Sequence, residues 1–517
     1  MDETTRAPRM AKPGAASLFV RLDAKAGIGL QQQIYAGMRR AILDGVARPG
    51  ARLPSSRELA RDLGVSRTTS LIALEQLRAE GYVTAERGSG TFVARELPDD
   101  LPARHVVRPA AAPKHPPLSK RGHALAATPS SAWRIPGPPR AFRIGTPAVD
   151  LLPVRLWSQL VNRRTRSVTL AELDYGSPAG LRALREAIAE HVRAARGAQC
   201  DASQVFVVAG AQQGLDLLAR VLLDPGDRMW MEDPGYPAAR YAFLAAGARL
   251  VSVPVDEEGL DVAAGARRAG DARLVFVSPS HQFPSGVPLS LARRLALLRW
   301  AAGAGAWIVE DDYDSEFRYG ARPLPCLQGL DADGRVIYVG SFSKTLFPAL
   351  RLGFLIVPPD LPARLIGARR AADLHPPIVT QAALADFMAG GHFASHLRRM
   401  RAAYAERLEA LEHAARRHGR GALRLRPVRT GLHAVADLEG VDAEAVGREA
   451  MARGVEVTPL CSYYAGGRRG TDALVMGFAA ARPESLAEGV VRLVAAIEAV
   501  ARPPRRSAGP LARVAAR

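Results

Sequence analysis

Two periodicities of apolar residues run along the chain and predict different kinds of structure. Up to about residue 81 the apolar positions follow a helical period, and a short strand-like stretch follows. Beyond residue 140, helical segments such as GLRALREAIAEHVRAARG alternate with short β-branched runs, namely VFVVAG, RMWMED, RLVSVPV, RLVFVS, AWIVED and RVIYVG. Strands that alternate with helices predict βαβ units and a largely parallel sheet with helices on both faces.

Changes in composition divide the chain into four predicted segments. A compact domain at residues 18–95 precedes a stretch at 96–139 that is rich in Pro and Ala, has no apolar periodicity and is typical of a linker. An α/β domain with a small C-terminal α+β region is expected at residues 140–502, and a basic, disordered tail at 503–517. At 517 residues the chain exceeds the roughly 250–300 at which one core stops growing, so two or more domains are expected.

The first domain carries dense capping and turn signals in the stretch LPSSRELARDLGVSRTTSLIALEQLRAEG. Ser55, with Glu58 three residues later, forms a capping box that predicts a short helix through Leu63. A Gly-Val turn follows, and Ser66 caps a second helix, so the pair predicts a helix-turn-helix. The polar start of the second helix is expected to enter a major groove, and its inward face is expected to be Ile72, Leu74 and Leu77.

A β-hairpin is predicted after the second helix. The strands YVTAE and TFV flank the turn RGSG, which places Arg87 and Gly88 at the tip. A basic side chain and bare backbone at this tip suit contact with phosphates or the minor groove. An ordinary helical hairpin beside a β-hairpin is the alternative interpretation.

The same stretch resembles the winged helix of the GntR family, from about Gln31 to Val93. The motifs LPSSRELARDLGVSRTT and LRAEGYVTAERGSGTFV carry the resemblance. One difference is Leu74, where relatives with a second domain of this kind often have tyrosine; this position is expected to face the core. The resemblance implies contact with double-stranded DNA by Arg57, Arg67, Thr68, Thr69, Arg87 and Gly88.

Overall composition narrows the class of protein. The formal net charge is +19 and the sequence pI is about 10.6, which favours a polyanionic partner, although arginines spread along the whole chain also produce such a charge without contact. The three cysteines lie far apart without a CxxC pair, so we expect no disulfide framework, no metal site and a reducing, cytoplasmic location. No signal segment and no run of about 20 apolar residues is present, so we expect no membrane partner.

The stretch VIYVGSFSKTLFPALRLGF places Lys344 directly after an apolar, β-branched run. A lysine that forms a Schiff base must lose its proton near neutral pH, which requires desolvation or neighbouring cations. The preceding strand and the nearby Arg351 satisfy both conditions. Ser341, Ser343 and Arg351 are also suited to binding a phosphate beside the lysine.

Further phosphate and ring contacts are predicted upstream. In VFVVAGAQQGLDLLARVL a strand runs into a helix that starts at Gly210, Ala211 and Gln212, whose free N–H groups attract anions. Tyr236 in WMEDPGYP lies on a tight loop after a strand, where its ring is placed to stack on a planar cofactor. Each feature also has an ordinary explanation, since Tyr236 can simply fill a loop.

The stretch AWIVEDDYDSEFRYG ends a buried strand in carboxylates and a tyrosine, at the sheet edge where open α/β folds bind ligands. An electron-withdrawing pyridine ring needs an anion near its nitrogen and a donor near its ring oxygen, for which Asp311 and Tyr313 are suited. Helix capping is the alternative for Asp312 and Asp314. Together, the phosphate site, the aromatic ring, the carboxylate and the lysine predict pyridoxal 5'-phosphate as the cofactor.

This order of motifs resembles the fold-type I aminotransferases, from about Phe142 to Ala501. In YGSPAGLRALREAIA the resemblance implies that Tyr175 reaches the phosphate of a neighbouring subunit, and therefore a homodimer. With the winged helix in front, and with EDDYDSEFRY and PSHQFPSG both present, the chain resembles the MocR-type branch of GntR regulators. That branch implies a transcription factor that holds the cofactor on Lys344 and senses an amino acid, an amine or the cofactor itself.

Two positions depart from ordinary aminotransferases. Phe283 stands where an asparagine usually lies beside the cofactor, which leaves His281 or Gln282 as substitutes. The arginine that usually clamps the substrate carboxylate, by bidentate pairing, aligns with Val475. The alternatives for this clamp are Arg240, Arg468 and Arg469.

Three functions remain open from the sequence. The first is a transcription regulator that senses its ligand through a Schiff base at Lys344. The second is a working aminotransferase with an accessory DNA-binding domain. The third, a DNA-binding scaffold with an inactive second domain, is disfavoured because a scaffold has no need for Lys344, Asp311 and Tyr313 together.

Overall fold

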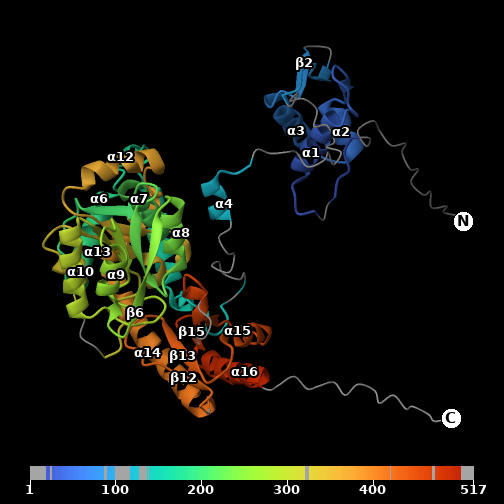
Figure 1. Ribbon diagram of the computed structural model, residues 1–517. Coiled ribbons are helices and arrows are strands. Elements are labelled where there is room, and N and C mark those ends of the chain that lie inside the picture. Colours follow the sequence, from blue (N-terminus) through green and yellow to red (C-terminus); the bar gives the residue numbers. More distant parts are fainter. Residues whose placement is uncertain are drawn as a thin grey trace, which may run out of the picture. The chain divides into compact units, whose positions relative to one another are not determined.

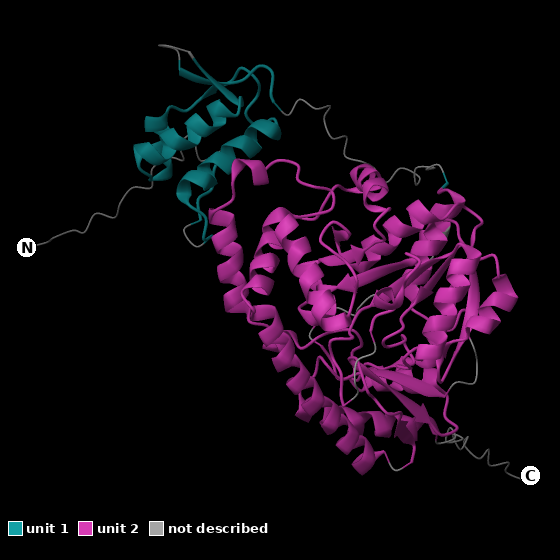
Figure 2. Ribbon diagram, turned by 90° about the vertical axis from the view of Figure 1, so that its left-hand side faces the viewer, with its two compact units in different colours: residues 1–117 teal, residues 118–517 magenta. Residues whose placement is uncertain are grey.

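The computed structural model describes residues 19–23, 26–86, 90–98, 117–126, 137, 139–320, 325–419, 421–467 and 472–501. Contacts divide the chain into two compact units, residues 1–117 and 118–517 (Figure 2). The tail expected at residues 503–517 lies outside the described residues. None of the described helices combines the length and the apolar character needed to cross a membrane.

Part of the stretch assigned to a linker is helical. Residues Lys120–Ala126 form α4, which belongs to the second unit and packs against α8 (Pro237–Ala245). The side-chain oxygen of Ser119 accepts a hydrogen bond from the backbone N–H of Gly122 at 2.9 Å and so caps this helix. No helix is predicted from the sequence in this stretch, and the helix that forms begins directly after a capping serine.

The first unit forms the predicted helix-turn-helix and hairpin. Ser55 makes both capping-box hydrogen bonds with Glu58, Gly64 ends the first helix at φ 65°, and the second helix is capped as predicted. Its three strands are antiparallel and pair in the order β1-β3-β2. The elements are α1 (Leu30–Leu43), β1 (Arg52–Leu53), α2 (Ser56–Leu63), α3 (Arg67–Ala79), β2 (Val83–Glu86) and β3 (Gly90–Val93) (Figure 1).

One face of α3 packs into the core of this unit. Ala73, Leu74 and Leu77 are buried, as the sequence predicts for the two leucines. Ile72 is 40% exposed, as is Leu71 beside it, so the prediction that Ile72 packs inward is wrong. The buried positions 70, 73, 74 and 77 follow the period of an α-helix, and residues 71 and 72 fall outside that stripe.

The second unit is built on an eight-stranded sheet with the order β4-β11-β10-β9-β8-β5-β6-β7. The pairs β10-β9, β9-β8, β8-β5 and β5-β6 are parallel, whereas β11 is antiparallel to β10 and β4, and β7 is antiparallel to β6. Every predicted strand is confirmed. The strands are β4 (Val205–Val208), β5 (Arg228–Asp233), β6 (Arg249–Asp256), β7 (Gly259–Leu260), β8 (Leu274–Val277), β9 (Trp307–Asp312), β10 (Val336–Ser341) and β11 (Gly353–Ile356).

Side chains alternate between the two faces of this sheet. On β4, Phe206 and Val208 join an apolar cluster with α7 and α8, whereas Val205 and Val207 join a cluster with α6, α13 and α14. Helices therefore cover both faces, as predicted (Figure 1). Besides α8, they are α5 (Val154–Arg166), α6 (Arg182–Arg196), α7 (Ala211–Leu222), α9 (Val262–Ala269), α10 (Leu291–Ala304), α11 (Phe342–Thr345), α12 (Pro362–Ala372) and α13 (Ile378–Ala389).

The C-terminal part of this unit is the predicted small α+β region. Its antiparallel sheet has the order β12-β13-β15-β14, and the long helix α14 packs against α16 (Figure 1). The elements are α14 (His392–His418), β12 (Leu423–Leu425), β13 (His433–Leu438), α15 (Ala443–Ala452), β14 (Thr458–Pro459), β15 (Ala473–Gly477) and α16 (Pro483–Ala501).

A buried ion pair ties α6 to the carboxyl ends of the strands. Arg196, the last residue of α6, donates to Asp312 Oδ2 at 2.7 Å and to Ser280 Oγ at 2.6 Å. The hydroxyl of Tyr338 donates to the same Asp312 oxygen at 2.8 Å. Burial alone raises the pKa of Asp312, but the Arg196 charge and the hydroxyl donors hold that pKa below its ordinary value. The charge at the end of β9 is therefore neutralised from within the fold.

Arg196→Ala is expected to destabilise the second unit by about 3–5 kcal/mol, because it leaves the Asp312 carboxylate buried without its cation. The measurement is the urea midpoint of unfolding followed by tryptophan fluorescence, since all five tryptophans belong to this unit. Arg193→Ala, an exposed arginine on the same helix, is the control and should cost under about 0.5 kcal/mol. Equal midpoints for the two variants contradict the prediction.

Candidate functional site

Lys344 lies where β10 turns into the short helix α11. Its Nζ atom donates a hydrogen bond to the backbone carbonyl of Gly145 at 2.8 Å, and the residue is half-buried. Gly145 has φ 69°, and a Cβ atom there would lie 3.0 Å from Nζ. Bare backbone at this position lets the lysine lie against the loop instead of extending into solvent.

Asp311 lies near the carboxyl end of β9 and is buried. Burial raises the pKa of its carboxyl group to about 7, the charges of Asp312 and Asp314 add to this rise, and the Lys344 charge opposes it. The Oδ1 atom is buried and makes no hydrogen bond within the described part of the chain. Since buried polar atoms normally have partners, this oxygen is suited to a cationic N–H donor brought by a ligand.

The two neighbouring carboxylates on β9 have protein partners. Asp312 is paired with Arg196, and Glu310 accepts two backbone N–H groups at 2.7 and 2.8 Å. Burial still raises the pKa of Glu310 to about 7. Oδ1 of Asp312 also makes no hydrogen bond within the described residues, but the other Asp312 oxygen is paired with Arg196. Asp311 is therefore the one of the three consecutive acidic residues that has neither an ion pair nor backbone N–H donors in the described part of the chain.

The predicted phosphate residues from two distant stretches come together. The Arg351 Nη2 atom donates to the carbonyl of Ala209 at 2.8 Å, directly before the turn into α7. A Cβ atom on Gly210, which has φ 93°, would lie 3.3–3.4 Å from the Arg351 guanidinium. At the start of α11, Ser341 Oγ accepts the backbone N–H of Ser343 at 3.1 Å. An arginine and two helix starts thus form a cradle of the kind that binds anions.

Ala211 and Gln212 begin α7, as predicted. The Gln212 Nε2 atom donates to the carbonyl of Ala238 at 2.9 Å, in the first turn of α8. This side chain therefore links the starts of α7 and α8. The backbone N–H of Gln212, and not its amide group, is the donor suited to a phosphate.

Phe283 stands at the centre of an aromatic cluster. The residue occupies the position of the usual asparagine, but its ring offers no hydrogen bond and instead packs edge-on against its neighbours. The centroid distances are 5.6 Å to Tyr236, 6.1 Å to Tyr313, 5.4 Å to His433 and 5.1 Å to Tyr463. The two tyrosines predicted to contact the cofactor ring are thereby held by one shared neighbour.

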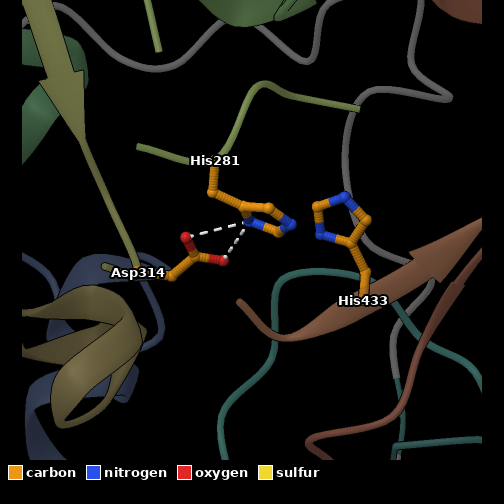
Figure 3. A group of neighbouring side chains, drawn as sticks. All are labelled: His281, Asp314 and His433. Carbon is orange, nitrogen blue, oxygen red and sulfur yellow. Dashed lines mark hydrogen bonds and ion pairs between the residues drawn. The ribbon is translucent and has the colours of Figure 1, made fainter. Parts of the chain in front are cut away.

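Of the two predicted substitutes for the asparagine, His281 is the one that meets Tyr313. Its Nδ1 atom lies 3.1 Å from the Tyr313 hydroxyl. The same atom lies 3.1 Å from each carboxylate oxygen of Asp314 (Figure 3). Gln282 is turned toward other groups, and its Nε2 atom donates to a backbone carbonyl at 2.9 Å. Burial also raises the pKa of Tyr313 well above its ordinary value, so this phenol keeps its proton.

His281, Asp314 and His433 also form a possible set of metal ligands within the described residues, with ligand atoms all within 4.8 Å of one another (Figure 3). No metal site is expected from the sequence. His281 and Asp314 bond each other, and His433 Nε2 lies 3.0 Å from the carbonyl of Pro284. Hydrogen bonds within the protein thus account for the cluster.

The remaining predicted residues fall at the edges of the site or outside it. Val475 is fully buried on β15, so the position aligned with a carboxylate clamp is apolar. Arg240 lies on α8 with its Nη2 atom 4.0 Å from Asp233, and Tyr175 is 83% exposed. The other two clamp candidates lie outside the described residues; they are Arg468 and Arg469.

The predicted DNA contacts on α2 and α3 are accessible. Arg57, Arg67 and Thr68 are exposed, whereas Thr69 is half-buried and engaged in the helix cap. Its hydroxyl lies 2.7 Å from Ser66 Oγ, and its backbone N–H donates to the same oxygen at 3.1 Å. The residues predicted at the wing tip, Arg87 and Gly88, lie outside the described residues.

The fold and the two sites define a class of protein, namely a helix-turn-helix unit joined to a unit with the fold-type I aminotransferase architecture. Residues 30–93 match the bacterial regulatory proteins of the gntR family, and residues 159–493 match the class I and II aminotransferases. The chain belongs to the GntR family of transcriptional regulators, in the MocR-type branch that carries an aminotransferase domain.

Similar proteins of the same length are regulators. The probable rhizopine catabolism regulatory protein MocR of Rhizobium meliloti is 41% identical over 93% of this chain and 96% of its own. The pyridoxine biosynthesis transcriptional regulator PdxR of Corynebacterium glutamicum is 34% identical over 90% and 95%. Among solved structures, the α-aminoadipate aminotransferase LysN of Thermus thermophilus, complexed with N-(5'-phosphopyridoxyl)-L-leucine, is 32% identical with a TM-score of 0.64, and covers 69% of this chain and 92% of that chain.

The contacts of several site residues, among them Gly145 and Asp314, cannot be predicted from the sequence because their partners lie far away along the chain. One local signal points to the lysine without any motif. Lys344 is the only lysine among residues 121–517, where arginine supplies the other permanent side-chain cations. A single lysine among so many arginines draws attention to this position, because an amine loses its proton far more readily than a guanidinium group does.

The stability of the cofactor-free protein is expected to fall as the pH rises from about 4 to about 7. Asp311 keeps its proton in the folded state over this range, so the unfolded state binds fewer protons. Asp311→Asn cannot release a proton and should flatten the slope, although the Glu232 and Glu310 carboxyl groups, whose pKa values burial raises to about 8 and about 7, retain part of it. Urea midpoints measured at several pH values test this, with Asp333→Asn, an exposed aspartate, as control. A slope unchanged in Asp311→Asn rules the prediction out.

Proposed function

We propose that the second unit binds pyridoxal 5'-phosphate as a Schiff base on Lys344, and that an amino acid, an amine or the cofactor itself controls DNA binding through it. The observation that carries this proposal is the buried Asp311 oxygen without a hydrogen bond, in a site that also holds a half-buried lysine. A protonated pyridine nitrogen is the donor that such an oxygen fits. The phosphopyridoxyl ligand named for the similar LysN structure supports the same cofactor.

Each residue of the site has a distinct role in this proposal. The cofactor supplies an electron-withdrawing ring, and the protein orients it. Asp311 keeps the ring nitrogen protonated, Tyr313 donates to the ring oxygen, and Tyr236 packs on the ring. The phosphate is bound by Ser341, Ser343, Arg351 and the backbone N–H groups at Gly210, Ala211 and Gln212.

A homodimer belongs to the same proposal. Apolar side chains of a monomer are seldom exposed in such density, and a two-fold interface covers them. Tyr175 of the partner subunit then completes the phosphate site, as expected from the sequence. The exposed side chains between residues 149 and 175 are Val149 at 38%, Leu151 at 40%, Val154 at 60%, Leu170 at 87%, Leu173 at 67% and Tyr175 at 83%.

A working aminotransferase is the second candidate. The 2-aminoadipate transaminase of Thermus thermophilus is 33% identical over 69% of this chain, which favours retained catalysis. Two features of the site disfavour efficient turnover, since Phe283 and Val475 replace polar residues that would hold substrate and cofactor. Sustained exchange between an amino donor and a keto acid distinguishes this candidate from a regulator, which needs at most one half-reaction.

Wild-type protein mixed with pyridoxal 5'-phosphate is expected to develop a visible absorption band that Lys344→Ala lacks. Borohydride reduction should then fix the cofactor on Lys344, because no other lysine lies in residues 121–517. Peptide mass mapping locates the label. Lys120→Ala on α4 is the matched control and should keep the band. A band in Lys344→Ala, or a label confined to another residue, contradicts the proposal.

The exposed side of α3 suggests how the first unit selects its DNA. Leu71 and Ile72 are each 40% exposed, one turn beyond Arg67 and Thr68. In a major groove, apolar side chains contact the methyl group of thymine, whereas arginine contacts guanine or phosphate. We therefore expect an operator in which thymine methyl groups face Leu71 or Ile72.

Replacing single thymines by uracil in an operator selected with the full chain should weaken binding about fourfold at one or more positions. This factor corresponds to one buried methyl group, about 0.8 kcal/mol. Leu71→Ala or Ile72→Ala should abolish the difference between thymine and uracil at its own position. Arg78→Ala, in the last turn of α3, is the control and should preserve it. If no thymine differs from uracil, the apolar face does not read the groove.

A further inference from the structure

A hydrogen-bonded row of three side chains lies beside the site of Lys344. Both carboxylate oxygens of Asp314 lie 3.1 Å from His281 Nδ1 (Figure 3). The Tyr313 hydroxyl lies 3.1 Å from the same nitrogen. His281 follows β8, and the other two residues follow β9, so adjacent parallel strands bring the three together. The side chains of His281 and Asp314 are 3% and 1% exposed. Water therefore cannot replace either partner freely.

The row is enclosed by the small C-terminal region. A Cβ atom on Gly431, which has φ 85°, would lie 2.2 Å from His281 Nδ1 and 2.7 Å from Asp314 Oδ2. Only glycine permits the backbone to pass so close. His433, two residues later, packs its ring against His281 with a centroid distance of 4.6 Å. The imidazole is thus fixed in position from two sides.

The number of protons on the three side chains determines which of them donates to which. A single Nδ1 atom faces a carboxylate and a phenol, and it carries either a proton or a lone pair. If Nδ1 carries the proton, it donates to Asp314 and cannot accept from Tyr313, so the phenol proton must point to another acceptor. If Nδ1 carries the lone pair, Tyr313 donates to it, and Asp314 must be protonated to donate as well. The tautomer of His281 therefore decides where the Tyr313 proton points.

The neighbouring groups favour the proton on Nδ1. Burial raises the pKa of Asp314, but the paired imidazole opposes that rise and favours the carboxylate. Burial lowers the pKa of His433 well below its ordinary value, so this neighbour is a neutral ring. Other charged groups act on the row: Lys344 is cationic, whereas Asp311, Asp312, Glu316 and Glu232 are acidic, and Asp312 and Glu316 add to the rise in the pKa of Asp314. A carboxylate on Nδ1–H is the usual device for fixing an imidazole tautomer.

We infer that His281 and Asp314 are positioning residues that direct the Tyr313 hydroxyl proton onto the ring oxygen of the bound cofactor. This inference rests on the proposed binding of pyridoxal 5'-phosphate at Lys344. These two residues orient the Tyr313 hydroxyl in place of an amide side chain at position 283, where this chain has phenylalanine. His281 acts through Tyr313, so its effect is expected in the electronic state of the cofactor and not primarily in its affinity.

The test is a pH titration of the visible band of the lysine-bound cofactor. The ring oxygen carries most negative charge in the high-pH form, so loss of an oriented donor should raise the midpoint of the titration. We expect an upward shift of about one pH unit in His281→Phe and in Asp314→Asn, which corresponds to one hydrogen bond to a charged acceptor. His281→Asn, which restores an amide, should recover part of the shift. His433→Phe, which keeps a ring against His281 and removes no hydrogen bond of the row, is the control for packing.

The outcomes separate this inference from the proposed function. If wild-type protein forms no band, cofactor binding fails and the inference fails with it. If wild type forms the band but all three variants of the row titrate within about 0.2 units of it, the inference alone is overturned. If the titration midpoint of His433→Phe shifts as much as those of the row variants, packing around His281 and not proton direction is responsible. If a chelator changes the midpoint of the wild type, a metal is bound at the row. Either result also overturns the inference. Thermal melting identifies a variant that does not fold, and the remaining substitutions then decide.

Discussion

The site depends on the burial of several carboxyl groups at one edge of a parallel sheet. Desolvation makes each of them costly as an anion, and their mutual repulsion adds to the cost. Within the fold, Arg196 pairs with Asp312, and two backbone N–H groups donate hydrogen bonds to Glu310. Oδ1 of Asp311 and Oδ1 of Asp312 both lack a donor in the described residues. Because the other Asp312 oxygen is paired with Arg196, Asp311 differs from its two neighbours in having no such partner, which suits it to a cationic group of a ligand.

Arginine and lysine have different roles in the second unit because their cations differ in chemistry. Guanidinium groups keep their charge under all ordinary conditions, so they suit permanent pairs such as Arg196 with Asp312 and the phosphate cradle at Arg351. An amine can lose its proton, and the unit has only two lysines in its sequence, Lys120 at the start of α4 and Lys344. With no second amine in residues 121–517 to compete for an aldehyde, selectivity for a single position follows from composition as well as from geometry.

What the sequence reveals depends on how far apart the interacting residues lie. Caps such as Ser55 and Ser66 act within three residues, and the buried strands are apolar throughout, so both are predicted correctly. The contact of His281 with Tyr313 exists because β8 and β9 pair, and no local pattern encodes that register. The apolar side chain of Ile72 predicts a core position, yet the helical period places it outside the buried stripe and on the accessible side of α3.

A site that is suited to a cofactor but lacks a contact for the substrate carboxylate can bind a ligand without turning it over efficiently. A transaminase needs a cation for the substrate carboxylate, and the aligned position here is the buried Val475 on β15. A sensor needs instead a contact that links the ligand site to a movable part of the protein. Gly431 joins the small C-terminal region to the His281–Asp314 pair with no room for a side chain. A ligand that shifts His281 would therefore press on the backbone at Gly431, which is the kind of coupling that a sensor needs.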